Sequence, residues 1–399
     1  MAPASAPTGG DAGVGTGDGE GKGRGKGKGH KKKKDKDAGK GAETGGMPES
    51  GGGGGKDLGE VEVHGRVIGR AELRTEAGML ATSDLSLQSA RAEVRWEWHD
   101  WLRAVVEVEL AGVEVKDAYV RAKWRWLGGR AGNFKPPVSA VEMESRWTLP
   151  ASERGLVNDV LVDKMGIAGR RPGMQLELTG GGFWDPKLRV GIFEGSHARS
   201  DDPNDDRLFR ALLDEYALGA ERLAARASVK PWGVEVGAFF EWRAVEPVRG
   251  DGFSRFWCAG ADASWDETLG PTAVRLWADG FAGSNWQDDN PFDGDGDTFL
   301  AARLIAAWRW GGLEKGAPYG EPYVMMEVVD PEATIGDDVL WEVSGGVNAG
   351  AWDRVRVTLE LQQRHYSRNV PLSLGLFDGV ILAPPYDRTA LLLQVGAAF

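Results

Sequence analysis

From residue 60 onward, apolar and charged side chains alternate with a period of two, which is the pattern of β-strands with one apolar face. In the first run, Val61, Val63 and Val67 alternate with Glu62 and Arg66. Runs with the same alternation follow at 84–98, 101–111 and 115–126. A face that carries so many charges in consecutive strands cannot form a dry core. It faces either bulk water, as in a soluble sandwich, or an aqueous lumen, as in a membrane barrel.

The last stretch, residues 387–399, favours the membrane barrel. Leu391, Leu393 and Val395 share one face of this run, and the chain stops on Phe399. An ordinary half-buried strand would show the same alternation. In a transmembrane barrel, however, the closing strand pairs with the first one, and its aromatic end lies in the interfacial girdle. We therefore expect Leu391, Leu393 and Val395 to face lipid and Phe399 to lie at the periplasmic girdle.

The number of such runs predicts an all-β fold, a 16-stranded antiparallel transmembrane β-barrel. The strands are expected near 60–73, 84–98, 101–111, 115–126, 128–136, 173–180, 187–194, 215–229, 233–246, 254–267, 272–285, 298–310, 322–330, 339–350, 354–367 and 387–399. The long loops then fall on one side, at 74–83, 138–172, 195–214, 247–253, 286–297, 331–338 and 368–386. Short turns fall on the other side, except for a long connection at 311–321. This layout is typical of the outer membrane of Gram-negative bacteria.

Residues 1–57 differ from the rest of the chain. They are rich in glycine and lysine and have almost no large apolar side chain, so we expect a disordered low-complexity tail before a barrel at 58–399. No aromatic residue is interleaved for base stacking, so we expect a solvated tether or weak contact with anionic polymers, and no nucleic acid. The first residues lack the basic and apolar regions of a secretory signal. Either the signal has been removed or the start is misassigned.

Composition excludes several classes of protein. The single cysteine, Cys258, rules out an internal disulfide, and no apolar run reaches the roughly 18 residues of a transmembrane helix. Many of the 17 tryptophans stand at the ends of alternating runs, as in aromatic membrane belts. Neither a nucleophile motif, nor a P-loop, nor metal-site spacing among the 5 histidines is present, so we expect no enzyme and no cofactor. Two alternatives stay open: a non-conducting surface scaffold, and a barrel hydrolase that pairs His64 or His365 with a distant serine.

The loop at 138–172 is too apolar to extend into water. It contains Leu149, Leu156, Val160 and Leu161. We expect it to fold into the lumen and constrict the pore, and the alternative is a lid packed over the mouth. The expected constriction residues are Met143, Trp147, Glu153 and Arg154.

Several short motifs resemble those of the phosphate-selective porin O and P family. The motifs are Lys116-Asp117-Ala118-Tyr119-Val120, Gly132-Asn133-Phe134-Lys135-Pro136-Pro137, Glu153-Arg154 with Leu156-Val157, Gly173–Gly180 and Val190–Gly195. The chain departs from the family pattern at Asn133, Val138 and Gly155, which stand where the family has Gln, Phe and Ser. The resemblance implies a sixteen-stranded channel, usually a homotrimer, in outer-membrane lipid, with phosphate or other small anions as its cargo.

Basic residues in the inward phase of the strands are the expected pore lining. They are Arg66, Arg70, Arg91, Arg95, Arg121, Lys123, Arg125, Lys135, Arg222, Arg226, Arg275 and Arg356. The aromatic residue Tyr119 is expected to line the pore beside them. Arginine presents a fork of donors that suits phosphate oxygens. The alternative is that these cations pair with inward carboxylates and only keep the lumen wet.

The overall charge of the chain argues against a preference for anions. The chain carries a net charge of −12, and much of the acidic excess lies in the outer loops. An acidic mouth repels phosphate unless divalent cations neutralise it. Asp293, Asp295 and Asp297 have calcium-like spacing, but Leu304 stands where a calcium loop carries its final glutamate. A solvated acidic loop is the simpler interpretation, and no metal site is expected.

Overall fold

The computed structural model describes residues 59–194, 222–245, 254–284, 298–312, 314–333, 336–367 and 386–399. They belong to the second of the chain's two compact units, Lys56–Phe399. The tail predicted at 1–57 lies outside the described residues, as do the loops predicted at 195–214, 247–253 and 286–297 and almost all of 368–386.

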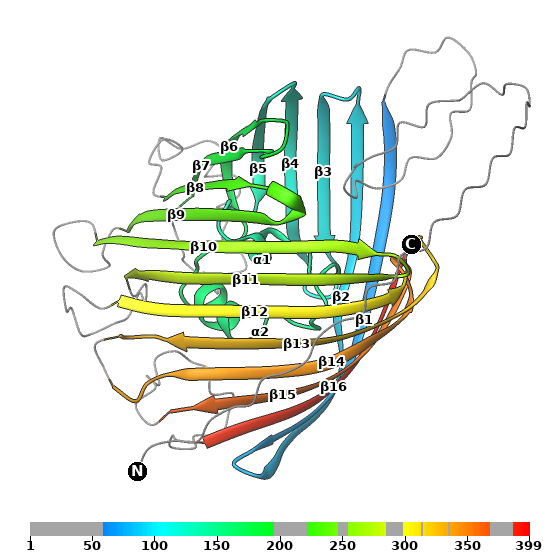
Figure 1. The fold of residues 1–399 in the computed structure, drawn as a ribbon, viewed down its shortest axis with the longest axis vertical. Helices are drawn as coiled ribbons and strands as arrows, with labels where there is room; N and C mark the ends of the chain where they lie inside the picture. The colour runs from blue at the N-terminus through cyan, green and yellow to red at the C-terminus, as the bar shows by residue number, and fades with distance from the viewer. Residues whose placement is uncertain are drawn as a thin grey trace, which may run out of the picture. The chain divides into compact units, whose positions relative to one another are not determined.

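Sixteen antiparallel strands close into one barrel, which confirms the predicted fold. Each strand pairs with its neighbours in chain order, and β16 returns to pair with β1. The strands are β1 (Glu60–Glu76), β2 (Met79–Trp98), β3 (Leu102–Glu109), β4 (Glu114–Trp124), β5 (Leu127–Phe134), β6 (Arg171–Thr179), β7 (Lys187–Phe193), β8 (Arg222–Val229), β9 (Glu235–Val245), β10 (Ser254–Leu269), β11 (Thr272–Ser284), β12 (Thr298–Gly311), β13 (Pro318–Asp330), β14 (Leu340–Ala351), β15 (Val355–Tyr366) and β16 (Tyr386–Ala398). In Figure 1 the wall β10–β15 crosses the wall β1–β5 steeply, because tilted strands on opposite walls of a barrel run in different directions.

Two predicted connections are wrong. The long loop expected at 74–83 is a hairpin, because β1 continues to Glu76 and β2 begins at Met79. Its two turn residues, Ala77 and Gly78, both have positive φ (48° and 77°), as in the tight turns that match strand twist. The connection at 311–321 is also shorter than expected, since β12 ends at Gly311 and β13 begins at 318. Polar residues at 74–76 and 82–83 interrupt the alternation in the first place, and Pro318 and Gly320 interrupt it in the second, although the strand pairing continues.

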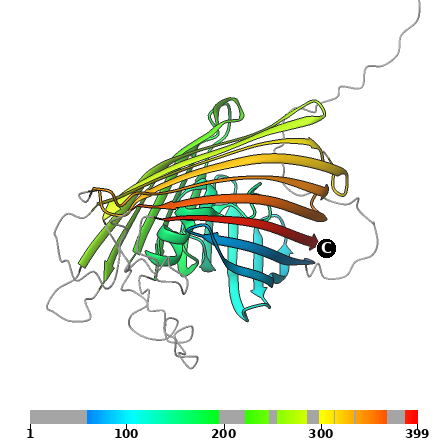
Figure 2. The same ribbon diagram turned by 90° about the horizontal axis from the view of Figure 1, so that it is seen from below.

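The seam of the barrel joins β16 to β1 side by side, as Figure 2 shows for the red and blue strands. Leu391, Leu393 and Val395 are exposed on the outer face, opposite buried inward residues of the same strand. The backbone of Phe399 exchanges two hydrogen bonds of 3.0 Å with Gly65. A Cβ at Gly65 would overlap the phenyl ring of Phe399, so this close approach requires glycine.

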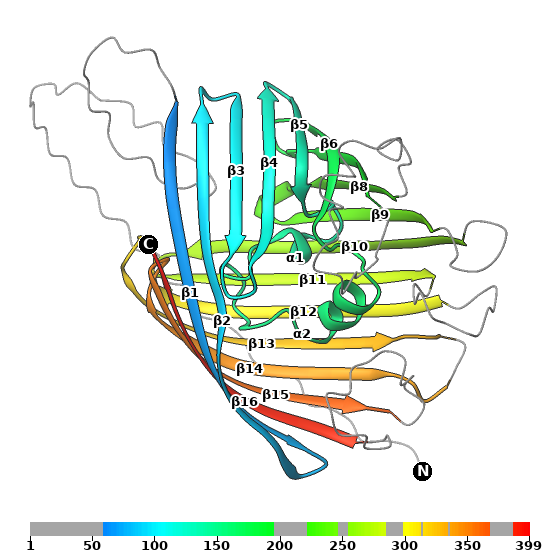
Figure 3. The ribbon, with the colours of Figure 1, turned by 180° about the vertical axis from the view of Figure 1, so that it is seen from behind.

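Short helical segments lie mainly in the connection between β5 and β6. They are α1 (Ala140–Met143), α2 (Gly155–Val157) and the π-helical turn η1 (Asn158–Lys164), and a 3-10 turn η3 (Pro231–Gly233) joins β8 to β9. None of the helices in the described part of the chain is long and apolar enough to cross a membrane. Figure 3 shows α1 and α2 between the wall β1–β5 and the wall β10–β13.

Candidate functional site: the lumen and its loop

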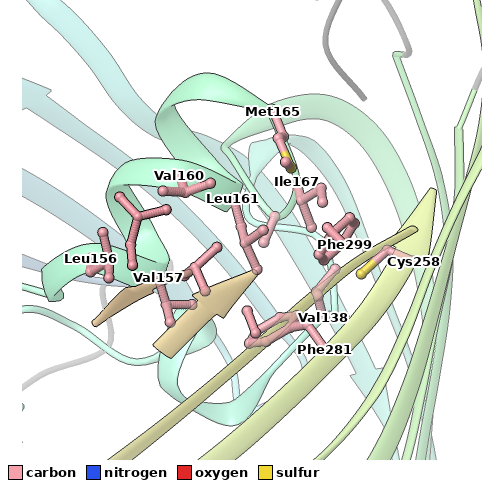
Figure 4. Close-up of a cluster of buried hydrophobic side chains, with 14 of the residues drawn as sticks. Val138, Leu156, Val157, Val160, Leu161, Met165, Ile167, Cys258, Phe281 and Phe299 are labelled. Atoms are coloured by element: carbon pink, nitrogen blue, oxygen red, sulfur yellow. The ribbon is translucent and has the colours of Figure 1, made fainter. Parts of the chain in front are cut away.

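The connection between β5 and β6, here called the lumen loop (138–170), packs on inward-facing side chains of β9–β15. Leu156, Val160 and Leu161 are fully buried, and they share one apolar cluster with Phe281 and Phe299 of the wall (Figure 4). A second cluster joins the loop to β11, β12 and β13: Val141, Leu149, Ala151, Trp277, Ile305, Ala307, Tyr323 and Met325. Each buried aliphatic side chain contributes roughly 1.5–3 kcal/mol. The loop therefore has an apolar core of its own against one half of the barrel.

Arg303 of β12 anchors the first half of the loop. Its guanidinium donates to Asp279 at 2.6 and 3.1 Å, to Glu142 at 2.8 Å and to the carbonyl of Arg154 at 3.0 Å. Ser139, which caps α1, donates to the same Asp279 carboxylate. Burial by itself raises the pKa of Glu142, but the charges of Arg303 and Arg154 outweigh it and hold that pKa below its ordinary value. Glu142 is thus an ionised carboxylate inside the packed loop.

Glu327 of β13 anchors the second half. Its carboxylate accepts hydrogen bonds from the backbone amides of Leu156 at 2.5 Å and Val157 at 3.3 Å, which are otherwise unsatisfied donors at the start of α2. Gly155 has a φ of 68°, and a Cβ there would overlap the Glu327 carboxylate. Both the positive φ and this contact therefore favour glycine at position 155.

Three of the arginines predicted to line the pore hold the backbone of the lumen loop instead. Arg275 donates at 2.7 Å and Arg356 at 2.8 and 3.0 Å to carbonyls of residues 147–149. Arg222 donates to the Gly166 carbonyl at 2.9 Å. All three guanidiniums are buried, because loop carbonyls need donors once water is removed. Sequence alternation identified their inward direction but not the chain segment that covers them.

Four other predicted lining residues also lie away from the main cavity. Arg226 is buried in a paired contact with Asp262, at 2.6 and 2.9 Å. Arg121 contacts a β6 carboxylate at 3.1 Å, and Lys123 is exposed near the end of β4. Arg125 is not a wall residue, because it occupies the turn after β4 with a φ of 52°. That prediction is corrected here, since the strand ends at Trp124.

A cavity of about 1730 Å³ is bordered by the lumen loop, by inward side chains of β1–β7, and by single residues of β9, β10, β11, β15 and β16. The predicted residues that line it are Arg66, Arg70, Arg91, Arg95, Tyr119 and Lys135 from the barrel, and Met143, Glu153 and Arg154 from the loop. Trp147 instead borders a separate space of about 30 Å³, together with Trp352 and Arg275. Its ring is close to Gly396 at the seam, where a Cβ would meet it.

The cavity lining contains fifteen arginine or lysine residues and twelve acidic ones. Many are paired, as the alternative interpretation of the sequence expected. Arg91 contacts Glu107 at 2.7 Å, Arg70 contacts Glu153 of the loop, and Arg170 of the loop contacts Asp117 of β4 at 3.0 Å. The pairs formed by Glu153 and Arg170 are ion pairs between the loop and the wall β1–β4, opposite the wall that holds its apolar clusters.

Four cations in the cavity lining form no ion pair with a carboxylate of the described residues, although carboxylates act on three of them from a greater distance: Arg66, Arg130, Lys135 and Arg146. Arg66 lies 5.9 Å from the Trp147 ring centre and 3.4 Å from the Ser145 hydroxyl. Arg130 lies over the ring of Tyr119 at 4.5 Å. Sequence reasoning missed Arg130 and Arg146. Arg130 shares the inward phase of β5 with Phe134, which was a usable signal, whereas Arg146 belongs to an irregular loop that has no period.

Lys135 and Arg154 are two positive charges that repel each other, one just before the lumen loop and one within it. The Lys135 ammonium donates to the carbonyls of Glu142 at 2.7 Å and Glu144 at 2.9 Å. Burial, together with the charges of Arg154 and Arg170, lowers the pKa of Lys135 well below its ordinary value. Burial also lowers the pKa of Arg154 to about 10. An anion placed here would compensate both groups.

The remaining candidate chemistry is limited. Within the described ranges, no group of three His, Cys, Asp or Glu side chains is placed to hold a metal ion. The weak calcium candidates Asp293, Asp295 and Asp297 lie outside those ranges. His64 contacts Glu62 at 3.2 Å, and His365 contacts Asp387 at 2.7 Å from the outward phase of β15.

Solved outer-membrane channels have the same architecture. The anion-selective porin from Comamonas acidovorans aligns with a TM-score of 0.56 at 11% identity, covering 85% of this chain and 99% of that chain. OprB of Pseudomonas putida aligns with a TM-score of 0.55 at 11% identity, covering 86% of this chain and 95% of that chain. The outer membrane channel DcaP of Acinetobacter baumannii aligns with a TM-score of 0.54 at 13% identity, covering 87% of this chain and 99% of that chain.

The chain has the fold of the 16-stranded porins. No protein-family model matches it, and no curated protein matches its sequence. The resemblance to the phosphate-selective family therefore stays a prediction. The porin barrel, with its apolar outer face, is that of a protein of the Gram-negative outer membrane, as predicted from the sequence.

Proposed function

We propose that the protein is a porin through which small hydrophilic solutes diffuse passively, and that its lumen prefers small anions, phosphate included. The observation that carries the anion preference is the set of four cations in the cavity lining that form no ion pair with a described carboxylate, Arg66, Arg130, Lys135 and Arg146. A charge near a narrow passage sets the sign of the ions that enter it. The lumen loop acts as the constriction, because it fills one side of the barrel and leaves the cavity on the other.

The expected effect of one such charge is measurable. Two unit charges about 4 Å apart interact by roughly 1 kcal/mol even at the dielectric constant of water, which is equivalent to about a fivefold change in local ion concentration. Replacing Arg66 or Arg146 by glutamine should therefore reduce anion preference several-fold. Arg103, which forms an exposed pair with Glu97 and is not part of the cavity lining, offers a matched control.

Planar-bilayer recording of the refolded protein tests the proposal. We expect discrete conductance steps, an anion-selective reversal potential in asymmetric salt, and partial block by phosphate. Arg66→Gln and Arg146→Gln should shift the reversal potential toward cations, and Arg103→Gln should not. A cation-selective wild type without phosphate block refutes the anion preference but leaves the porin. An absence of steps from correctly folded protein favours the non-conducting scaffold.

A further inference from the structure

The connection between β13 and β14, residues 331–339, is acidic and contains no basic residue. It includes Glu332, Asp337 and Asp338, and Asp330 ends the preceding strand. Figures 1 and 3 show the β13–β14 connection at the end of the barrel away from the C-terminus. Because it follows the end of β13 and precedes β14, the connection lies outside the membrane-spanning strands.

Strand pairing and hydrogen bonds hold both ends of this connection. The ladder between β13 and β14 places Asp338 one residue beyond the position opposite Asp330. The Ala333 amide donates to a carbonyl at the start of β12 at 2.8 Å, and the Val339 carbonyl accepts from the Ser367 hydroxyl at 2.5 Å. The backbone that carries the two aspartates is therefore fixed against the end of the barrel.

Asp338 is buried without a partner. Its side chain is fully buried, and neither carboxylate oxygen has a hydrogen-bond partner among the described residues. Oδ1 of Asp330 is also enclosed and unpartnered in this part of the chain. Burying a charged group without a partner is strongly unfavourable, and buried polar groups of folded proteins are almost always satisfied. Asp338 therefore needs a partner that the described chain does not supply.

The charges around Asp338 identify the kind of partner. Burial and the charge of Asp330 raise the pKa of Asp338 to about 6, although the nearby backbone amides of Glu332 and Asp338 lower it. Above pH 7 the carboxyl is thus mostly ionised, and a proton does not neutralise it. Water brings no charge, and the connection has no basic side chain. A cation from solution compensates the charge and satisfies the oxygens.

Ca²⁺ suits this set of ligands better than Mg²⁺ does. It takes about six to eight oxygen ligands from carboxylates, backbone carbonyls and water, in a flexible geometry. Two carboxylates are enough where carbonyls and water supply the rest, so a third acidic side chain is not required. Mg²⁺ demands a near-ideal octahedron and keeps most of its water, which fits a buried carboxylate less well.

We propose that Asp338 and Asp330 bind a Ca²⁺ ion that holds the two ends of the β13–β14 connection together. The ion compensates both carboxylates and stabilises the packed position of the connection. This inference does not depend on conduction, because it follows from the buried carboxylate and not from the lumen.

Hydrogen–deuterium exchange of a peptide that spans residues 331–340 tests the site in the full refolded chain. The expected dissociation constant is about 10⁻⁴–10⁻³ M, as in Ca²⁺ sites of extracellular proteins. An ion that binds only the packed connection shifts its opening equilibrium in proportion to the ion concentration. At pH 7.5, Ca²⁺ at about ten times the dissociation constant should therefore slow exchange about tenfold relative to EDTA at equal ionic strength.

Three variants separate binding at this site from general screening of an acidic surface. Asp338→Asn and Asp330→Asn should both lose the effect of Ca²⁺. In EDTA the Asp338→Asn peptide should exchange more slowly than the wild-type peptide, because the amide leaves no charge buried. Asp337→Asn is the matched control and should keep the effect, since Asp337 is exposed and its φ of 68° suits asparagine as well as aspartate.

A gel mobility that changes on heating shows that each variant barrel is folded. Equal exchange of the wild type in Ca²⁺ and in EDTA overturns the proposal, and so does a Ca²⁺ effect that persists in Asp338→Asn. Slower exchange at pH 5, without a response to Ca²⁺ at pH 7.5, identifies a proton as the partner and also overturns it. These measurements do not involve conductance, so failure of the site leaves the proposed porin function untouched.

Discussion

Removing the guanidinium of Arg303 should release the lumen loop without harming the barrel. In Arg303→Met the side chain keeps its length but loses its contacts with Asp279, Glu142 and the Arg154 carbonyl. The carboxylates of Glu142 in the loop and Asp279 on β11 are both buried while the loop is docked. When the loop leaves the wall, both carboxylates become hydrated. The substitution therefore raises the free energy of the docked state and not that of the open state.

The magnitude follows from the burial of the cluster. Breaking a buried ion pair by removing one partner costs about 3–5 kcal/mol, which is roughly a 10²–10⁴-fold change in an equilibrium constant. The apolar contacts of Leu156, Val160 and Leu161 remain, so the loop should stay docked most of the time. We therefore expect brief openings of larger conductance, at least 100-fold more frequent than in the wild type.

Single-channel recording at constant voltage measures the frequency of these openings. Arg103→Met is the matched control, because its pair with Glu97 is exposed and such pairs contribute about 0–1 kcal/mol. A triple variant, Arg303→Met with Asp279→Asn and Glu142→Gln, removes the uncompensated charges and should restore long closed intervals. Openings at the wild-type frequency in folded Arg303→Met would refute the role of the loop as the constriction.

Three further predictions concern the seam, the cavity charge and the docked loop. Deleting Phe399 removes its two backbone hydrogen bonds to Gly65 and should lower the amount of assembled barrel in the outer membrane more than the conductance of each channel; normal assembly would contradict this. Because the pKa of Lys135 is lowered, anion preference should fall as pH rises through the folded pKa. Between that pKa and about 10.4 the folded protein holds fewer protons than the unfolded chain, so stability should rise with pH in that window. Titrations of reversal potential and melting temperature should show both changes, and Lys135→Gln should lack them. Gly155→Ala, which is strained at a φ of 68° and meets Glu327, should undock α2 at a cost of about 1–3 kcal/mol, seen as faster proteolysis within the loop, whereas Gly181→Ala, where a Cβ meets open space, should not.

Most of the strand framework could be predicted from local pattern. The alternation of Val61, Val63 and Val67 with charged neighbours depends only on neighbouring residues of one strand, and so does the run that ends at Phe399. The extension of β1 to Glu76 could not be predicted, because polar residues there hide the alternation while the backbone pairing persists. Ladder hydrogen bonds do not depend on side-chain polarity.

The amino-acid sequence by itself determined the class of fold, the number of strands and the inward direction of most of the strand arginines that it singled out, because a period of two assigns every strand residue to a face. Only the tertiary structure decided what those inward arginines do. Arg66 and Arg70 border the cavity, whereas Arg222, Arg275 and Arg356 bond to the carbonyls of the lumen loop. The loop has no periodic sequence pattern from which its position could be predicted. Its apolar side chains pack against Phe281 and Phe299, and this packing places the loop on that wall of the barrel. Arg66, Arg130 and Lys135 lie on or beside the opposite wall, and they keep their charges facing the cavity.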